Sequence, residues 1–193
     1  MQSLCVFCGS RQGLDPAYTK AARSLGTMLA EANIRLVFGG GHVGLMGVIS
    51  NAALEAGGDV IGVIPRSLVE RELAHAGLTD LRIVGSMHER KALMSDLSEG
   101  FITLPGGTGT LEEFFEVLTW AQLGEHEKPC GLLNVAGYYD PLLSVFDHMV
   151  HKGFLSESNR TLVLAESEPE RLLQKLESYQ PPKIAKWIDQ SET

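Results

Sequence analysis

Short apolar segments alternate along this chain with segments of helical periodicity. The apolar segments cover residues 4–8, 34–38, 60–64, 81–84, 101–104, 131–135 and 161–165. Strands that alternate with helices favour a parallel sheet with helices on both faces, joined by right-handed crossovers. The sequence therefore predicts an α/β fold of three layers. Its 193 residues fit a single domain over residues 1–180, followed by a polar tail over residues 181–193.

Local signals mark the ends of several predicted helices. Asp15 followed by Pro16 is typical of an N-cap and the first helical position. Ser86 and Glu89 form a capping-box pattern that opens a helix over residues 88–98. We also expect Ser167 to cap a helix over residues 169–179. Further helices are predicted over residues 44–56, 111–118 and 139–151, and one or two helical turns within residues 66–79.

Glycine-rich loops follow three of the predicted strands directly, over residues 8–10, 39–47 and 105–110. In open parallel sheets, ligands bind beyond the carboxyl ends of the strands. Glycines let successive backbone N–H groups converge, and a following helix N-terminus adds positive potential. The alternative is a set of tight turns without a ligand. The sequence therefore predicts a phosphate site built from Gly106, Gly107, Thr108, Gly109 and Thr110, with further phosphate or nucleotide contacts from Gly9, Ser10, Gly40 and Gly41.

The loop over residues 39–44 also matches the pattern G-x-G-x-x-G, but the context for a dinucleotide is poor. That motif usually follows the first strand and has an acidic residue at the end of the second. Here the loop follows the second strand, and Asp59 begins a strand instead of ending one. A P-loop is excluded because G-K-[ST] is absent from the sequence.

Charge and cysteine content narrow the function classes. With 16 basic and 24 acidic residues, the chain carries a net charge of −8, so binding to nucleic acid or to anionic membranes is not expected. Three cysteines make no disulfide framework, and the N-terminus lacks the charged region of a signal peptide, which favours a reducing cytoplasm. Cys5 and Cys8 could form a redox pair or half a zinc site, but three residues apart in a strand they should point to opposite faces of the core. No metal or other cofactor is expected.

Charged residues beside the glycine loops are the candidates for chemistry. Thr110 and Glu113 fit a second capping box, yet a carboxylate just past a phosphate could instead face a sugar, stabilising an oxocarbenium-like carbon or activating water. Arg90 and Lys91 lie in the first turns of a predicted helix, where cations oppose the helix dipole. That cost favours phosphate and ribose contacts over a simple solvated pair, and arginine suits bidentate anion recognition.

These motifs strongly resemble the LONELY GUY (LOG) family of cytokinin riboside 5′-monophosphate phosphoribohydrolases. The resemblance covers about residues 3–178 and is most specific in three segments: Gly39-Gly40-Gly41-x-x-Gly44-Leu45-Met46-Gly47, Met87-His88-Glu89-Arg90-Lys91 and Pro105-Gly106-Gly107-Thr108-Gly109-Thr110-Leu111-Glu112-Glu113. It implies a Rossmann-like fold, a homodimer and hydrolysis of the N-glycosidic bond of adenine nucleotide 5′-monophosphates to free base and ribose 5-phosphate. A lysine decarboxylase, an older label in this family, is disfavoured because nothing in the sequence suggests a lysine that binds pyridoxal phosphate.

The resemblance also implies roles for individual residues. The catalytic pair would be Arg90 and Glu113. Substrate contacts would come from Glu72, Arg90, Lys91, Gly106, Gly107, Thr108, Gly109, Thr110, Leu111, Glu112, Glu113 and Thr119. Two other functions remain open from the sequence: a nucleotide-binding or carrier module without catalysis, and a general AMP nucleosidase.

Overall fold

The computed structural model describes residues 1–70 and 73–182, and contains a seven-stranded parallel sheet. The strand order is β4-β3-β2-β1-β5-β6-β7. The strands are β1 (Ser3–Phe7), β2 (Arg35–Phe38), β3 (Val60–Pro65), β4 (Asp80–Val84), β5 (Phe101–Thr103), β6 (Cys130–Leu133) and β7 (Val163–Glu166). This confirms the predicted α/β class, and each predicted apolar segment overlaps one strand.

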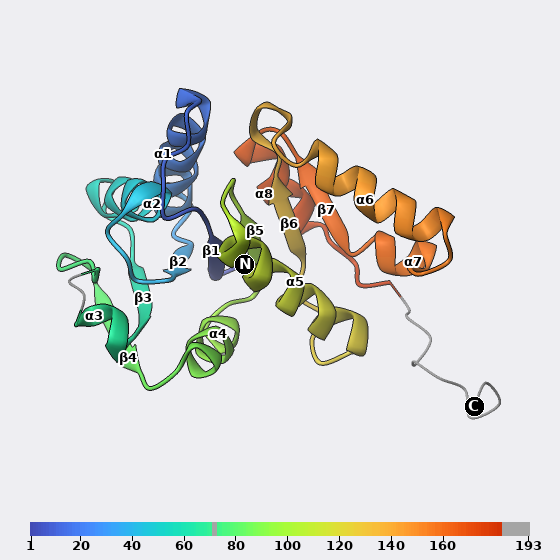
Figure 1. The fold of residues 1–193 in the computed structure, drawn as a ribbon. Helices are drawn as coiled ribbons and strands as arrows, with labels where there is room; N and C mark the ends of the chain where they lie inside the picture. Colours follow the sequence, from blue (N-terminus) through green and yellow to red (C-terminus); the bar gives the residue numbers. More distant parts are fainter. Residues whose placement is uncertain (71–72, 183–193) are drawn as a thin grey trace.

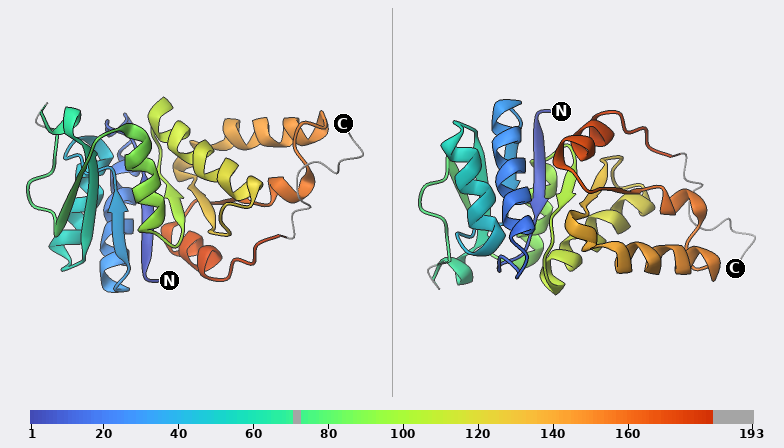
Figure 2. Two further views of the ribbon diagram at one scale, coloured as in Figure 1. Left: turned by 90° about the horizontal axis from the view of Figure 1, so that it is seen from below. Right: turned by 90° about the horizontal axis from the view of Figure 1, so that it is seen from above.

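Helices cover both faces of the sheet, which gives the three predicted layers (Figures 1 and 2). The elements are α1 (Pro16–Glu31), α2 (Gly44–Glu55), α3 (Arg66–Val69), α4 (Met87–Asp96), α5 (Thr108–Leu123), the 3-10 turn η1 (Val135–Gly137), α6 (Asp140–His151), α7 (Glu157–Arg160) and α8 (Pro169–Glu177). In Figure 1, α1, α2 and α8 lie on one side of the sheet and α4 and α5 on the other.

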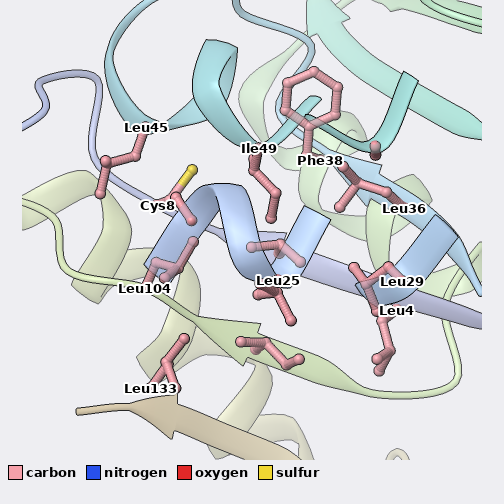
Figure 3. Close-up of a cluster of buried hydrophobic side chains, with 14 of the residues drawn as sticks. Leu4, Cys8, Leu25, Leu29, Leu36, Phe38, Leu45, Ile49, Leu104 and Leu133 are labelled. Carbon is pink, nitrogen blue, oxygen red and sulfur yellow. The ribbon is translucent and has the colours of Figure 1, made fainter. Parts of the chain in front are cut away.

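Two apolar clusters fill the spaces between the layers. One packs β1, β2 and β5 against α1, α2 and α8, and Figure 3 shows its leucine-rich centre around Leu25 and Ile49. The other packs the opposite face of the sheet against α4, α5 and α6. Cys5 belongs to the second cluster and Cys8 to the first, and both thiols are free and buried. The expectation of core cysteines on opposite faces is therefore confirmed.

Asp15 caps α1 as predicted, by accepting from the N–H of Ala17 at 2.8 Å. Two other local expectations need correction. Glu168, not Ser167, is the N-cap of α8. Val135 lies in the turn η1 because the chain leaves the sheet after Leu133. The short helix α7 was missed because its four residues are too few to produce a helical period.

The topology brings the three glycine loops together at the carboxyl ends of the strands. The chain moves outward from β1 to β4 on one side, then returns to the other side of β1 with β5. The order therefore reverses between β1 and β5, which is the point where open α/β sheets commonly bind ligands. The three glycine loops follow β1, β2 and β5, so they meet at this carboxyl edge.

Candidate active site

A cavity of about 350 Å³ opens at the carboxyl edge of the sheet. One wall is polar and comes from α4 and the start of α5, with Arg90, Thr108, Thr110, Glu112 and Glu113. The apolar part of the lining is formed by Val43, Met46, Ile64, Leu68, Leu73 and Met87. The cavity thus combines charged groups with an apolar surface, as ligand sites usually do.

Arg90 is a buried cation whose guanidinium is held from three directions. The residue is 8% exposed. Its Nε donates to the carbonyl oxygen of Val63 at 3.0 Å, and its Nη2 donates to that of Gly39 at 3.3 Å. Its Nη1 lies 3.1 Å from Oε1 of Glu113. These contacts fix the plane of the guanidinium, so the side chain is preorganised before any ligand binds.

The first turn of α4 aims Arg90 into the cavity. The Ser86 hydroxyl accepts from the N–H of Glu89 at 3.1 Å, which is the first half of the predicted capping box. The reciprocal half differs, because the Glu89 carboxylate accepts from the N–H of Gly85 at 2.7 Å. Ser86 is thus the N-cap as predicted, and α4 begins at Met87, one residue before the predicted start.

Glu113 is equally buried, at 8% exposure. Burial raises its pKa above the ordinary glutamate value, and the positive charge of Arg90 opposes that shift. The capping-box interpretation is wrong: α5 begins at Thr108 with Gly107 as its N-cap, so Thr110 and Glu113 both lie inside the helix. A buried carboxylate paired with a buried guanidinium in a cavity is typical of a catalytic centre.

The loop before α5 is open toward the cavity. Within the described part of the chain, a Cβ added at Gly107 or Gly109 would meet no atom within 4 Å. The first N–H groups of α5, a helix of 16 residues, are therefore accessible at the positive end of its dipole. Such a helix start can hold a phosphate.

The loop after β2 has a different structural role from a phosphate cradle. A Cβ at Gly39 would lie 1.9 Å from Nη2 of Arg90, so this position must be glycine for the guanidinium to fit. Gly40 has a φ of +72°, and its carbonyl oxygen accepts from the N–H of His75 at 2.9 Å. Gly39 and Gly41 line the cavity beside Arg90. Whether Gly40 and Gly41 also contact a nucleotide stays a prediction.

A second cavity of about 360 Å³ lies at the reversal point between β1 and β5. Gly9, Gly106 and Tyr138 line it, and it shares Ser10 and Gly107 with the first cavity. The Tyr138 hydroxyl donates to the carbonyl oxygen of Gly106 at 2.6 Å and closes one end. The structure thus brings Gly9 and Ser10 next to the loop before α5, and their contact with a phosphate or nucleotide stays a prediction.

Some predicted residues lie away from the cavity. Lys91 points toward Glu112 and Glu116 on α5. Thr119 is exposed, and its hydroxyl donates to the carbonyl oxygen of Phe115 at 2.7 Å. Leu111 packs against the core cluster under α5. Glu72 lies outside the described residues.

Sequence reasoning missed the apolar wall of the cavity. Its signal was present, because Met46 lies within the second glycine loop and Met87 is the first residue of the helix that carries Arg90. Apolar residues are so common that only the fold reveals which ones face a cavity.

Residues 1–70 and 73–182 contain no group of three or more His, Cys, Asp or Glu side chains that could hold a metal ion. They also contain no helix long and apolar enough to cross a membrane.

Comparison with known proteins identifies relatives over most of the chain. A family model described as "Possible lysine decarboxylase" matches residues 46–176. A protein of Oryza sativa subsp. japonica named "Probable cytokinin riboside 5′-monophosphate phosphoribohydrolase" is 54% identical, over 93% of this chain and 73% of its own length. A cytokinin riboside 5′-monophosphate phosphoribohydrolase of Arabidopsis thaliana is 51% identical, over 92% of this chain and 83% of its own.

Among solved structures, a molybdenum cofactor binding protein from Rippkaea orientalis matches with a TM-score of 0.69 and 24% identity. The match covers 92% of this chain and 97% of that protein. At this identity the likeness shows a shared fold and no more.

Proposed function

The chain belongs to the LOG family of cytokinin riboside 5′-monophosphate phosphoribohydrolases, and we propose that it hydrolyses the N-glycosidic bond of adenine-type nucleoside 5′-monophosphates. The products are the free base and ribose 5-phosphate. The observation that carries this proposal is the buried Arg90–Glu113 pair, 3.1 Å apart, beside the open start of α5. A site that only holds the phosphate has no use for a buried carboxylate, which repels the anion.

The three parts of the nucleotide match three parts of the cavity. The 5′-phosphate binds the N–H groups and hydroxyls of residues 107–110 at the start of α5. The ribose lies beside Glu113, one helical turn further along. The base packs against the apolar wall that includes Met46, Leu73 and Met87. An apolar wall also accommodates an apolar N6 substituent, which supports N6-modified nucleotides as substrates in addition to AMP.

The chemistry then follows from the position of Glu113. As the bond between C1′ and the purine nitrogen breaks, its electron pair leaves with the base and positive charge develops on the ribose. The Glu113 carboxylate stabilises that charge and accepts a proton from the water that attacks C1′. The departing base takes up a proton. Arg90 keeps Glu113 ionised and contacts the ribose and the phosphate.

The proposal extends to the domain organisation, oligomeric state, location and partners of the chain. Residues 1–180 form a single catalytic domain that acts as a homodimer in the cytoplasm, without a cofactor, a nucleic-acid partner or a membrane partner. Exposed apolar side chains on α5 and α6, at Leu123 and Val145, and Phe154 after α6 support self-association. The net charge of −8 supports the absence of nucleic-acid and membrane partners.

A product assay separates hydrolysis from carriage. Purified protein is incubated with AMP and, separately, with isopentenyladenosine 5′-monophosphate, and free base is measured by chromatography. We expect release of both bases, with the ratio of kcat/KM values giving the preference at N6. Tight nucleotide binding without release of either base would instead identify a carrier.

Gly39→Ala tests whether the loop after β2 exists to admit Arg90. The new Cβ would collide with Nη2, so the guanidinium must leave its position beside Glu113. A displacement of about 1 Å at a catalytic group costs about 10²-fold in kcat/KM. The control is Gly77→Ala, where an added Cβ would make ordinary contacts with His75 at 3.4 Å. If Gly39→Ala turns over like Gly77→Ala, the clearance is not needed for catalysis.

A further inference from the structure

Three carboxylates lie close together in the first turns of α5: Glu112, Glu113 and Glu116. Glu112 and Glu116 are four residues apart and therefore share one face of the helix, where two like charges destabilise it. Lys91 reaches both of them from α4. Its Nζ pairs with Oε1 of Glu112 and lies 3.0 Å from Oε2 of Glu116. The side chain of Lys91 is 7% exposed, so this cation is nearly enclosed by the two acids and by its own helix.

The position of Glu112 makes its ion pair with Lys91 important for phosphate binding. Glu112 lines the cavity, and its side chain is 55% exposed. It lies in the second turn of the helix whose start we propose as the phosphate site. A free carboxylate there would repel a phosphate and weaken the attraction of the helix dipole. Lys91 removes this conflict by holding the carboxylate and cancelling its charge.

We propose that Lys91 is a positioning residue that acts through Glu112 and Glu116, and is not itself a phosphate ligand. It pairs with two carboxylates on α5 and offsets part of their negative charge, which keeps the helix start attractive to an anion and leaves Glu113 facing Arg90. This inference rests on the proposed function for the identity of the anion. It differs from the expectation drawn from the sequence, in which Lys91 contacts the nucleotide directly.

The charges around Glu113 set its pKa, and a change in that pKa gives a second measurable effect of losing Lys91. Arg90 and Lys91 act on it from α4, and Glu112 and Glu116 act on it from its own helix. The buried thiols of Cys5, in β1, and of Cys8, just after β1, also lie within its electrostatic range. Burial raises the pKa of both thiols, so they are neutral near pH 7. Burial also raises the pKa of Glu113, Arg90 and Lys91 lower it, and Glu112 and Glu116 raise it. Loss of Lys91 therefore raises the pKa of Glu113 further.

The decisive comparison is between Lys91→Met and the triple variant Lys91→Met/Glu112→Gln/Glu116→Gln. Binding of ribose 5-phosphate is measured by calorimetry, and kcat/KM for AMP is measured across pH. Lys91→Met should weaken ribose 5-phosphate binding ~10–100-fold and move the acidic limb of the kcat/KM profile to higher pH. In the triple variant no carboxylate is left without its cation, so binding should return to within about threefold of wild type.

The opposite pattern would overturn the proposal. If Lys91 contacts the phosphate directly, the triple variant will bind as weakly as Lys91→Met. Lys91→Met can also fail to fold, because it leaves Glu116 half-buried without its cation; the triple variant then carries the test alone. Lys175→Met, which removes an ion pair with Glu166 at 2.5 Å between α8 and β7, is the matched control and should bind like wild type.

Calorimetry keeps this test separate from the proposed function. Ribose 5-phosphate has no glycosidic bond to a base, so its binding can be measured in a protein that does not hydrolyse AMP. A wild-type protein that releases no base would end the phosphoribohydrolase proposal. Recovery of ribose 5-phosphate binding in the triple variant would still support the role of Lys91.

Discussion

Glu113→Gln is expected to lower kcat for AMP hydrolysis about 10²–10⁴-fold while AMP still binds. Glutamine has nearly the same shape, but it carries no charge to stabilise the developing oxocarbenium ion and cannot accept a proton from water. The substitution therefore removes an interaction made in the transition state and should change KM little. Turnover would be measured by free-base release, and AMP affinity by calorimetry on the inactive variant.

Stability gives the control for this variant. Because the pKa of Glu113 is raised in the folded chain, its favourable contribution to folding is present below the unfolded pKa and is lost as pH rises through the folded pKa. Glutamine carries no charge, so it avoids the cost of burying a charged carboxylate that raises the pKa of Glu113. The thermal midpoint of Glu113→Gln should therefore equal or exceed that of wild type. A variant that is both unstable and inactive would point to a structural role.

Arg90→Met is the second substitution with a large expected effect. It removes the cation 3.1 Å from Glu113, along with the hydrogen bonds to Val63 and Gly39. We expect kcat/KM to fall about 10²–10⁴-fold, because the substrate loses a preorganised contact and Glu113 is harder to ionise.

The pH profile distinguishes Arg90→Met from a general disturbance. Arg90 lowers the pKa of Glu113, so its removal should raise that pKa and move the acidic limb of residual activity to higher pH. Arg23→Met is the matched control, since it breaks an exposed ion pair with Glu55 at 3.1 Å, between α1 and α2. An acidic limb that stays in place in Arg90→Met would show that the two groups do not interact in the working enzyme.

Most of the fold was predictable because its signals are local. Asp15 and Pro16 mark the start of α1, and each apolar segment overlaps one strand. Local signals fail where two neighbouring residues compete for one role. Ser167 and Glu168 can both precede a helix that begins at Pro169, and the sequence gives no means of ranking them.

The site was predictable in its parts and less so in its contacts. The sequence identified Arg90 and Glu113 as candidates, but their pairing depends on two helices that β5 separates. The same limit applies to Lys91, whose charge was recognised while its partners on α5 were not. Gly39 is the clearest example, because its need for glycine comes from an arginine 51 residues away. Such long-range requirements leave no trace in local spacing.

The measurement that tests the central claim most directly is the product balance of AMP hydrolysis by wild type and Glu113→Gln, run side by side. Adenine and ribose 5-phosphate would be quantified in the same reaction. We expect equal amounts of both products from wild type and almost none from Glu113→Gln. Adenosine with inorganic phosphate, or base release by Glu113→Gln at the wild-type rate, would contradict the account.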